Sequence, residues 1–168
     1  MAGELGLGYA FAGFINPDGA SRALLRHSVF SAPAPAPATS ANRPAGGCGI
    51  LSVSAVVADT DFEARRLNWS RTALMARLAR HGTMARVPTV EEAERELSQD
   101  QKDIPTVITD GRWPRQLAGS AQTVRDQLEQ MTKVTGVDEV MVQDVNAAHA
   151  ERAHSRALLA RALDIAPR

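Results

Sequence analysis

The side chains best suited to chemistry are few and scattered along the chain. The four histidines are His27, His81, His149 and His154, and none has the spacing of a metal site. His149 and His154 are five residues apart, which places them on different faces of a helix. The single cysteine, Cys48, excludes an internal disulfide and lacks the companion ligands of a zinc site, so we expect a buried structural thiol. We therefore expect no metal.

No motif in the sequence assigns a catalytic residue either. The chain contains no Gly-x-Ser-x-Gly nucleophile elbow and no phosphate-binding P-loop. Any chemistry must then depend on how the fold gathers ordinary polar side chains, or on a cofactor. The catalytic residues stay unknown at this level.

Composition limits the class of protein that could position such a site. The 168 residues suit one domain with a core, and 44% hydrophobic with 23% charged residues is typical of a globular protein. Lys plus Arg equals Asp plus Glu, 19 each, which argues against a nucleic-acid partner. No apolar run reaches the roughly 18 residues of a membrane span, and no signal peptide is evident, so we expect a cytoplasmic protein without a membrane partner.

Mostly apolar segments with little alternation indicate strands that are covered on both faces, as in parallel sheets. The sequence predicts such strands at residues 7–14, 49–58 and 139–145. Between and after them it predicts helices at residues 18–30, 60–81, 90–99, 120–136 and 147–163. The clearest helix begins with a capping box of Thr60 and Glu63 and ends near Gly82. Its apolar stripe contains Leu67, Leu74 and Leu78.

Two stretches lack a period. Residues 31–47 are rich in Pro and Ala and predict an exposed loop, rather than a ligand for a proline-binding partner. Residues 102–119 predict an irregular loop. A basic run at residues 65–86 precedes an acidic run at 91–103, and we interpret these as two solvated helix faces that attract each other.

The order of strands and helices leaves two architectures. Parallel strands connected through helices form a doubly wound sheet or a (β/α)8 barrel. Three strands cannot close a barrel, so the sequence reads as part of a larger fold.

Five segments resemble, in the same order, the luciferase-like monooxygenases, and in particular the bacterial group similar to alkanal monooxygenase. They are spread from Glu4 to Leu163, and each is weak alone, but five in the correct order are a specific signal. The segments are ELGLGYAFAGFINPDGA, VSAVVADTDFEARRL, AGSAQTVRDQLEQM, TGVDEVMVQDV and ERAHSRALLARAL. Residues 120–122, Ser-Ala-Gln, lack the usual Pro and Glu of the family, and the insert at residues 32–38 replaces a shorter family segment.

The resemblance implies an α/β fold, a partial (β/α)8 TIM barrel to which residues 1–168 supply the last three parallel strands with their helices. It also implies an oxidoreductase in which reduced FMN, delivered by a separate flavin reductase, reacts with O2 and a small organic substrate. A whole barrel needs roughly 250 residues. The family's first five strands, which carry much of the flavin site, have no counterpart here.

We therefore expect a truncated chain that is incomplete and inactive alone and that has an N-terminal half or a second copy as a partner. The alternative is a non-catalytic remnant that binds no flavin and self-associates through its open sheet edges.

Barrel sites lie at the carboxyl ends of the strands. The residues there that would bind flavin or substrate in a completed barrel are Gly13, Phe14, Asn16, Gln143 and Asn146. Phe14 would be an apolar wall, although plain core packing explains it equally well. Gln143 or Asn146 would donate a hydrogen bond.

Three other polar residues at or near these ends have simpler interpretations. We expect Asp59 to cap a helix rather than to take part in catalysis, because it stands beside Thr60. Asp144 would cap the last helix. Ser155 would pack or form a local hydrogen bond at the base of the barrel rather than act as a nucleophile.

Overall fold

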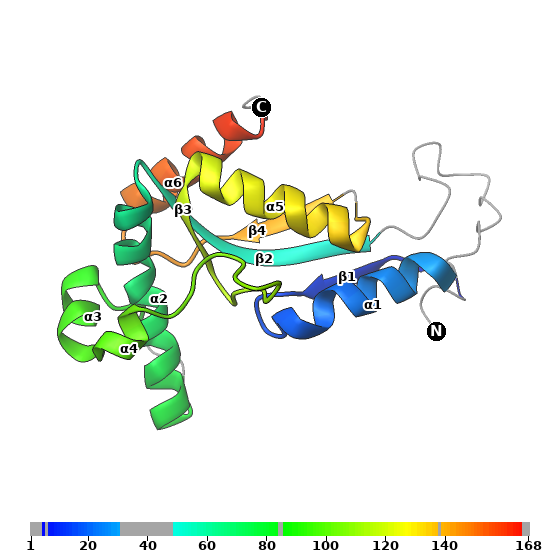
Figure 1. Cartoon of the computed structure of the whole chain (residues 1–168). Coiled ribbons are helices and arrows are strands. Elements are labelled where there is room, and N and C mark those ends of the chain that lie inside the picture. Colours follow the sequence, from blue (N-terminus) through cyan, green and yellow to red (C-terminus); the bar gives the residue numbers. More distant parts are fainter. Residues whose placement is uncertain (1–4, 6, 31–48, 84–85, 138, 166–168) are drawn as a thin grey trace.

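The computed structural model describes residues 5, 7–30, 49–83, 86–137 and 139–165 (Figure 1). The proline-rich segment at residues 31–47 and Cys48 lie outside them. The strands are β1 (Tyr9–Ala12), β2 (Gly49–Ala58), β3 (Leu117–Ser120) and β4 (Glu139–Gln143). The helices are α1 (Pro17–Phe30), α2 (Asp61–His81), α3 (Val90–Glu96), α4 (Gln99–Lys102), α5 (Ala121–Thr135) and α6 (His149–Ala162).

An open parallel sheet is built around the long strand β2. Strand β1 pairs with its first half from Tyr9↔Gly49, β4 pairs with it from Ile50↔Glu139, and β3 pairs with its second half from Ala55↔Leu117. The parallel α/β fold expected from the sequence is confirmed. The described sheet has four strands rather than three, and β4 lies against β2 rather than beside its predecessor β3.

The strand that the sequence missed, β3, begins inside the expected irregular loop at residues 102–119. Its residues are Leu-Ala-Gly-Ser, which contain no β-branched side chain and no alternation. The segment has low intrinsic propensity for strand, and pairing with the second half of β2 stabilises it as one. The rest of that loop contains one isolated antiparallel bridge, between Thr109 and Arg112.

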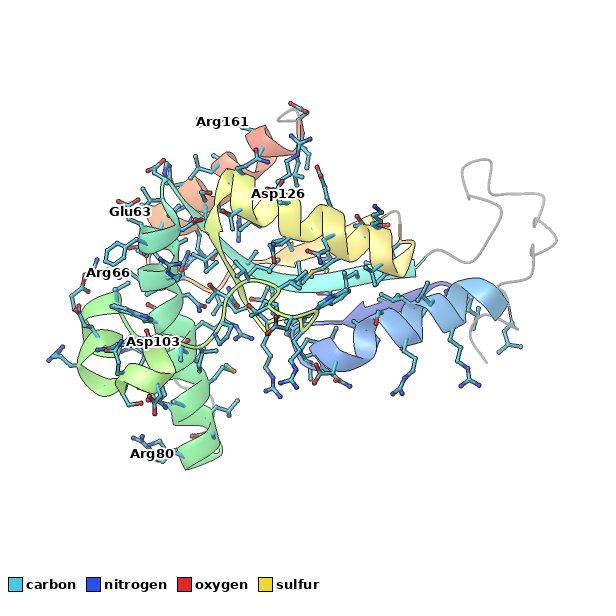
Figure 2. All side chains as sticks on the ribbon, viewed as in Figure 1. Glu63, Arg66, Arg80, Asp103, Asp126 and Arg161 are labelled. Carbon is cyan, nitrogen blue, oxygen red and sulfur yellow. The ribbon has the colours of Figure 1, made fainter. Side chains whose placement is uncertain are left out.

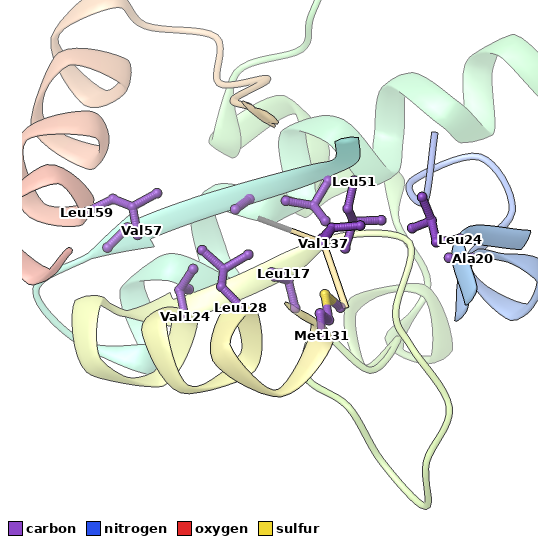
Figure 3. Close-up of a cluster of buried hydrophobic side chains, with 12 residues drawn as sticks. Ala20, Leu24, Leu51, Val57, Leu117, Val124, Leu128, Met131, Val137 and Leu159 are labelled. Carbon is purple, nitrogen blue, oxygen red and sulfur yellow. The ribbon is translucent and has the colours of Figure 1, made fainter. Parts of the chain in front are cut away.

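Helices cover both faces of β2, which explains why its sequence does not alternate. Side chains on one face, including Leu51 and Val57, pack against Leu24 of α1, Leu128 of α5 and Leu159 of α6 (Figure 3). On the other face, Val56 and Ala58 share a second cluster with residues of α2, namely Ala64 and Leu67. Successive strand residues point to opposite faces, and helices cover both faces. The strand therefore buries both its odd- and its even-numbered side chains.

The helix ends follow the capping signals in the sequence. Thr60 caps α2 by accepting a hydrogen bond from the backbone N–H of Glu63 at 3.2 Å, and Gly82 ends that helix with a left-handed φ of 71°. Ser120 caps α5, and Gly136 ends it in the same way as Gly82 ends α2. One expected helix, at residues 90–99, is instead two short helices. Thr89 forms a capping box with Glu92 at the start of α3, and Ser98 forms another with Gln101 at the start of α4.

Ion pairs join the basic helix α2 to the acidic helix α3, as the sequence predicted. The Arg66 guanidinium lies 3.6 Å from Glu91 and 3.8 Å from Glu94, and Arg77 pairs with Glu96. Figure 2 shows Arg66 where α2 faces α3. These pairs are partly or fully exposed to solvent, so each contributes little to stability.

Among the described residues, no helix is both long and apolar enough to cross a membrane.

Candidate functional site

A cavity of about 720 Å³ lies where β1 and β4 end and α2 passes beside them. That volume is within the range of about 300–1,000 Å³ typical of small-molecule sites. Most of its lining surface is apolar, from Phe14, Ile15, Met75, Leu78, Ile104 and Val145. The cavity therefore borders the carboxyl ends of β1 and β4, the kind of position at which parallel α/β proteins bind ligands, and also the segment that leads into β3.

Two of the five residues expected to bind flavin or substrate lie in the wall of this cavity. Phe14 follows β1 and Gln143 is the last residue of β4, and both side chains are half-buried. Gly13 lies beside a much smaller neighbouring void that Phe14 also lines. A Cβ atom at Gly13 would lie 3.1 Å from Leu51 Cδ1 and 3.2 Å from the Ser52 carbonyl oxygen, so the close approach of β1 to β2 favours glycine here.

The other two expected residues lie outside the cavity. Asn16 is exposed at the start of α1, where its carbonyl oxygen accepts a hydrogen bond from the Gly19 N–H at 3.3 Å. Asn146 is buried, and neither atom of its side-chain amide has a hydrogen-bond partner among the described residues. Its carbonyl oxygen accepts a hydrogen bond from Arg152 at 2.6 Å.

Six polar residues of the cavity were not anticipated from the sequence, among them Thr72 of α2 and Gln101 of α4. Asn68 and Arg71 come from the middle of α2, and Arg115 and Gln116 come from the segment just before β3. Asn68 is only 6% exposed and Gln116 only 5% exposed. The Asn68 Oδ1 atom and both amide atoms of Gln116 have no hydrogen-bond partner within the described part of the chain. Buried polar atoms are normally satisfied, and these atoms lie beneath the cavity surface, so they would meet a ligand only if their side chains moved.

A signal for Arg71 was present in the sequence. It stands four residues after Leu67 and three before Leu74, so it shares their stripe on α2. A cation on an apolar face of a helix needs contact with solvent or with polar groups, because burial among apolar side chains is costly. In the structure it is half-buried at the cavity wall, and burial, followed by the positive charge of Arg115, lowers the pKa of Arg71.

The polar residues around the end of β2 have structural partners that differ from the expected ones. Asp59 does not cap a helix: its carboxylate lies 3.1 Å from His154 Nε2 of α6, and Thr60 is the cap of α2. Ser155 Oγ accepts a hydrogen bond from the Val57 N–H at 2.9 Å. This hydrogen bond joins residues 98 positions apart at the carboxyl end of β2, and it is therefore not the local bond expected at the base of a barrel.

The expectation for Asp144 was also wrong, because Ala148 occupies the cap position of α6 and makes no side-chain cap. Neither oxygen of the Asp144 carboxylate has a hydrogen-bond partner among the described residues. Burial raises the pKa of this carboxyl group, although the Ser155 hydroxyl and the charges of Arg156 and Arg152 act in the opposite direction.

A search of the described residues finds no group of three His, Cys, Asp or Glu side chains that could hold a metal ion.

Comparison with known proteins gives partial matches. No family model matches the chain. The uncharacterized protein YvbT of Bacillus subtilis (strain 168) is 29% identical over 161 residues, and the uncharacterized protein YceB of the same organism is 30% identical over 145 residues. The matches span 95% and 84% of this chain but only 44% and 39% of those relatives. The chain thus spans less than half the length of the curated relatives it matches.

A solved structure is also similar to this chain in three dimensions. The crystal structure of apo-MsnO8 superimposes with a TM-score of 0.81 and 31% identity, over 99% of this chain and 48% of that one. The spatial arrangement described above is therefore similar to about half of a longer protein.

Proposed function

Because this chain has the structure of part of a luciferase-like monooxygenase, we propose that it forms one portion of an enzyme that uses reduced FMN and O2 to oxidise a small organic substrate. The observation that carries the proposal is the cavity at the carboxyl ends of β1 and β4. It lies where a completed barrel would hold its ligands. Reduced FMN, when bound, supplies the electrons with which O2 is activated.

The side chains that line the cavity match a flavin in chemical character. A flavin ring is flat and largely apolar, and it carries carbonyl and N–H groups along one edge. Phe14, Met75 and Ile104 provide apolar surface, while the amides of Gln143, Gln116 and Asn68 can pair with the polar edge. Gln116 and Asn68 have amide atoms without a partner beneath the cavity surface, and a ligand would satisfy them once their side chains rotate towards it.

In this proposal each residue has a positioning role. Phe14 forms an apolar wall that excludes water, and Gln143 orients the ring or the substrate by a hydrogen bond. Gly13 lets β1 approach β2 closely enough for Phe14 to reach the cavity. Asn16 and Asn146 would take part only after a rearrangement, since both lie outside the cavity.

The proposed partners are motivated by the share of MsnO8, 48%, that this chain matches. We propose that an N-terminal half, or a second copy of this chain, completes the fold, and that a separate flavin reductase delivers reduced FMN. Within the described sheet, β1 and β4 each pair only with β2, so each has one edge available for further strands.

The direct test is anaerobic titration of reduced FMN into the purified chain, with and without the portion of MsnO8 outside the matched region. We expect saturable binding in the mixture and weaker or no binding to the chain alone. Phe14→Ala should weaken binding in the mixture, whereas Phe62→Ala, at an exposed position on α2, should not. Absence of saturable binding under both conditions would refute the proposal.

A second candidate, a non-catalytic fragment that self-associates, is favoured by exposed apolar side chains beside the open edges. Leu7 is 53% exposed next to β1, and Met141 is 56% exposed within β4. Sedimentation equilibrium distinguishes the two: a concentration-dependent oligomer that Met141→Lys dissolves, and that binds no flavin, would favour the fragment.

A further inference from the structure

Two arginines share the cavity without an anion to neutralise them. Within the described part of the chain, neither Arg71 nor Arg115 has an ion-pair or hydrogen-bond partner. Other arginines around α2, such as Arg66, Arg77 and Arg86, are each paired with glutamates of α3. Arg71 and Arg115, by contrast, line the cavity and have no such carboxylate partner among the described residues.

The surroundings of the two cations differ, because Arg115 is exposed whereas Arg71 is half-buried in the cavity wall. Arg71 is half-buried, and its pKa is lowered by burial and by Arg115, so its positive charge is disfavoured where it stands. Next to it, Asn68 and Gln116 are buried with amide atoms that lack partners. A guanidinium remains protonated in proteins, so this arrangement can be relieved only by a bound anion or by movement of the side chain.

From these contacts we propose that the Arg71–Arg115 side of the cavity binds the anionic group of an amphipathic ligand, a carboxylate or a phosphate. Guanidinium groups pair with such oxyanions through two parallel hydrogen bonds. Gln116 and Asn68 flank the anion, and their amides would bind neighbouring hydroxyl or N–H groups of the ligand after the side chains rotate towards the cavity. The apolar side chains of Met75, Leu78 and Ile104 hold its hydrocarbon part.

The anion has two possible sources, the phosphate of FMN and an acidic group on the organic substrate. The binding site itself rests on geometry alone, and only its assignment to flavin or substrate rests on the proposed function.

Titration calorimetry with octanoate and octanol tests the site, because the two probes share a hydrocarbon chain and differ in charge. We expect octanoate to bind at least about tenfold more tightly than octanol, and added salt to weaken only octanoate binding. Arg71→Met should weaken octanoate binding about tenfold or more and leave octanol binding unchanged. Arg80→Met is the matched control, because Arg80 is exposed on the same helix and lies outside the cavity (Figure 2).

Arg115→Met keeps the test decisive if Arg71→Met perturbs folding, since Arg115 is exposed and its loss removes no packing. FMN compared with riboflavin identifies the source: tighter FMN binding that both variants abolish assigns the flavin phosphate, and octanoate binding that persists beside bound FMN assigns the substrate. The site is refuted if octanol binds as tightly as octanoate, or if both variants bind octanoate and FMN like the unmodified chain.

These results are separate from the test of the proposed function. If the assembled protein binds reduced FMN while Arg71→Met and Arg115→Met leave octanoate binding unchanged, the anion site is wrong. The monooxygenase proposal is unaffected by that result.

Discussion

Two buried serines, Ser155 and Ser70, allow the energy of one hydrogen bond to be isolated. Both are in helices and nearly inaccessible, with 3% and 1% of their surface exposed. Ser155 Oγ accepts a hydrogen bond from the Val57 N–H at 2.9 Å, whereas Ser70 Oγ has no partner among the described residues. The same substitution, serine to alanine, therefore removes in α6 the acceptor of the Val57 N–H, together with the hydroxyl that acts on Asp144, and in α2 no hydrogen bond.

The expected magnitudes follow from what each substitution leaves behind. Ser155→Ala leaves the buried N–H of Val57 without an acceptor, which costs about 1–3 kcal/mol. The gain in helix propensity from serine to alanine, about 0.5 kcal/mol, applies to both variants and cancels in their difference. Ser70→Ala removes an unpaired hydroxyl from the interior, so its unfolding free energy should be unchanged or slightly higher.

Urea unfolding followed by circular dichroism provides the measurement, with equal slopes confirming that both variants unfold as the original chain does. Hydrogen exchange at the Val57 amide gives a local readout, and it should accelerate only in Ser155→Ala. Equal losses of stability for the two variants would refute the reasoning, because the cost would then come from lost volume and not from the hydrogen bond to Val57.

Three further predictions concern burial and charge. Leu74→Ala should lower the unfolding free energy by about 2–5 kcal/mol because Leu74 is buried, whereas Val134→Ala, at a more exposed position, should cost less than about 1 kcal/mol in the same assay. Asp144→Asn should stabilise the chain at pH 7, because the raised pKa means that folding disfavours the charged carboxyl group. This advantage should vanish as the pH falls below 3.8, where the aspartate is protonated in both states, and a constant advantage would contradict it. Arg86→Met should raise the pKa of Glu92 from about 2 towards 4.5, as followed by NMR titration, since the hydrogen bond from Arg86 is the largest cause of the shift; an unchanged pKa would exclude that cause.

The sequence by itself determined the elements whose signals are local. The boundaries of β2 were predicted at residues 49–58 and observed there, because a run of ten mostly small or apolar residues is bounded by glycine and by a helix cap. The start of α2 and the end of α5 followed from Thr60 with Glu63 and from Gly136, since caps act within a single helical turn. The family resemblance came from such segments in order, and it implied the parallel α/β fold.

Only the tertiary structure decided which strands are neighbours and which side chains meet. Strand β3 forms because β2 offers it a pairing edge, and nothing in Leu-Ala-Gly-Ser predicts that partner. Arg71 and Arg115 are 44 residues apart, and they share a cavity because α2 and the segment before β3 pass the same end of the sheet. Local patterns describe interactions within a few residues, whereas a binding cavity depends on contacts between distant segments, which the packing of the whole chain sets.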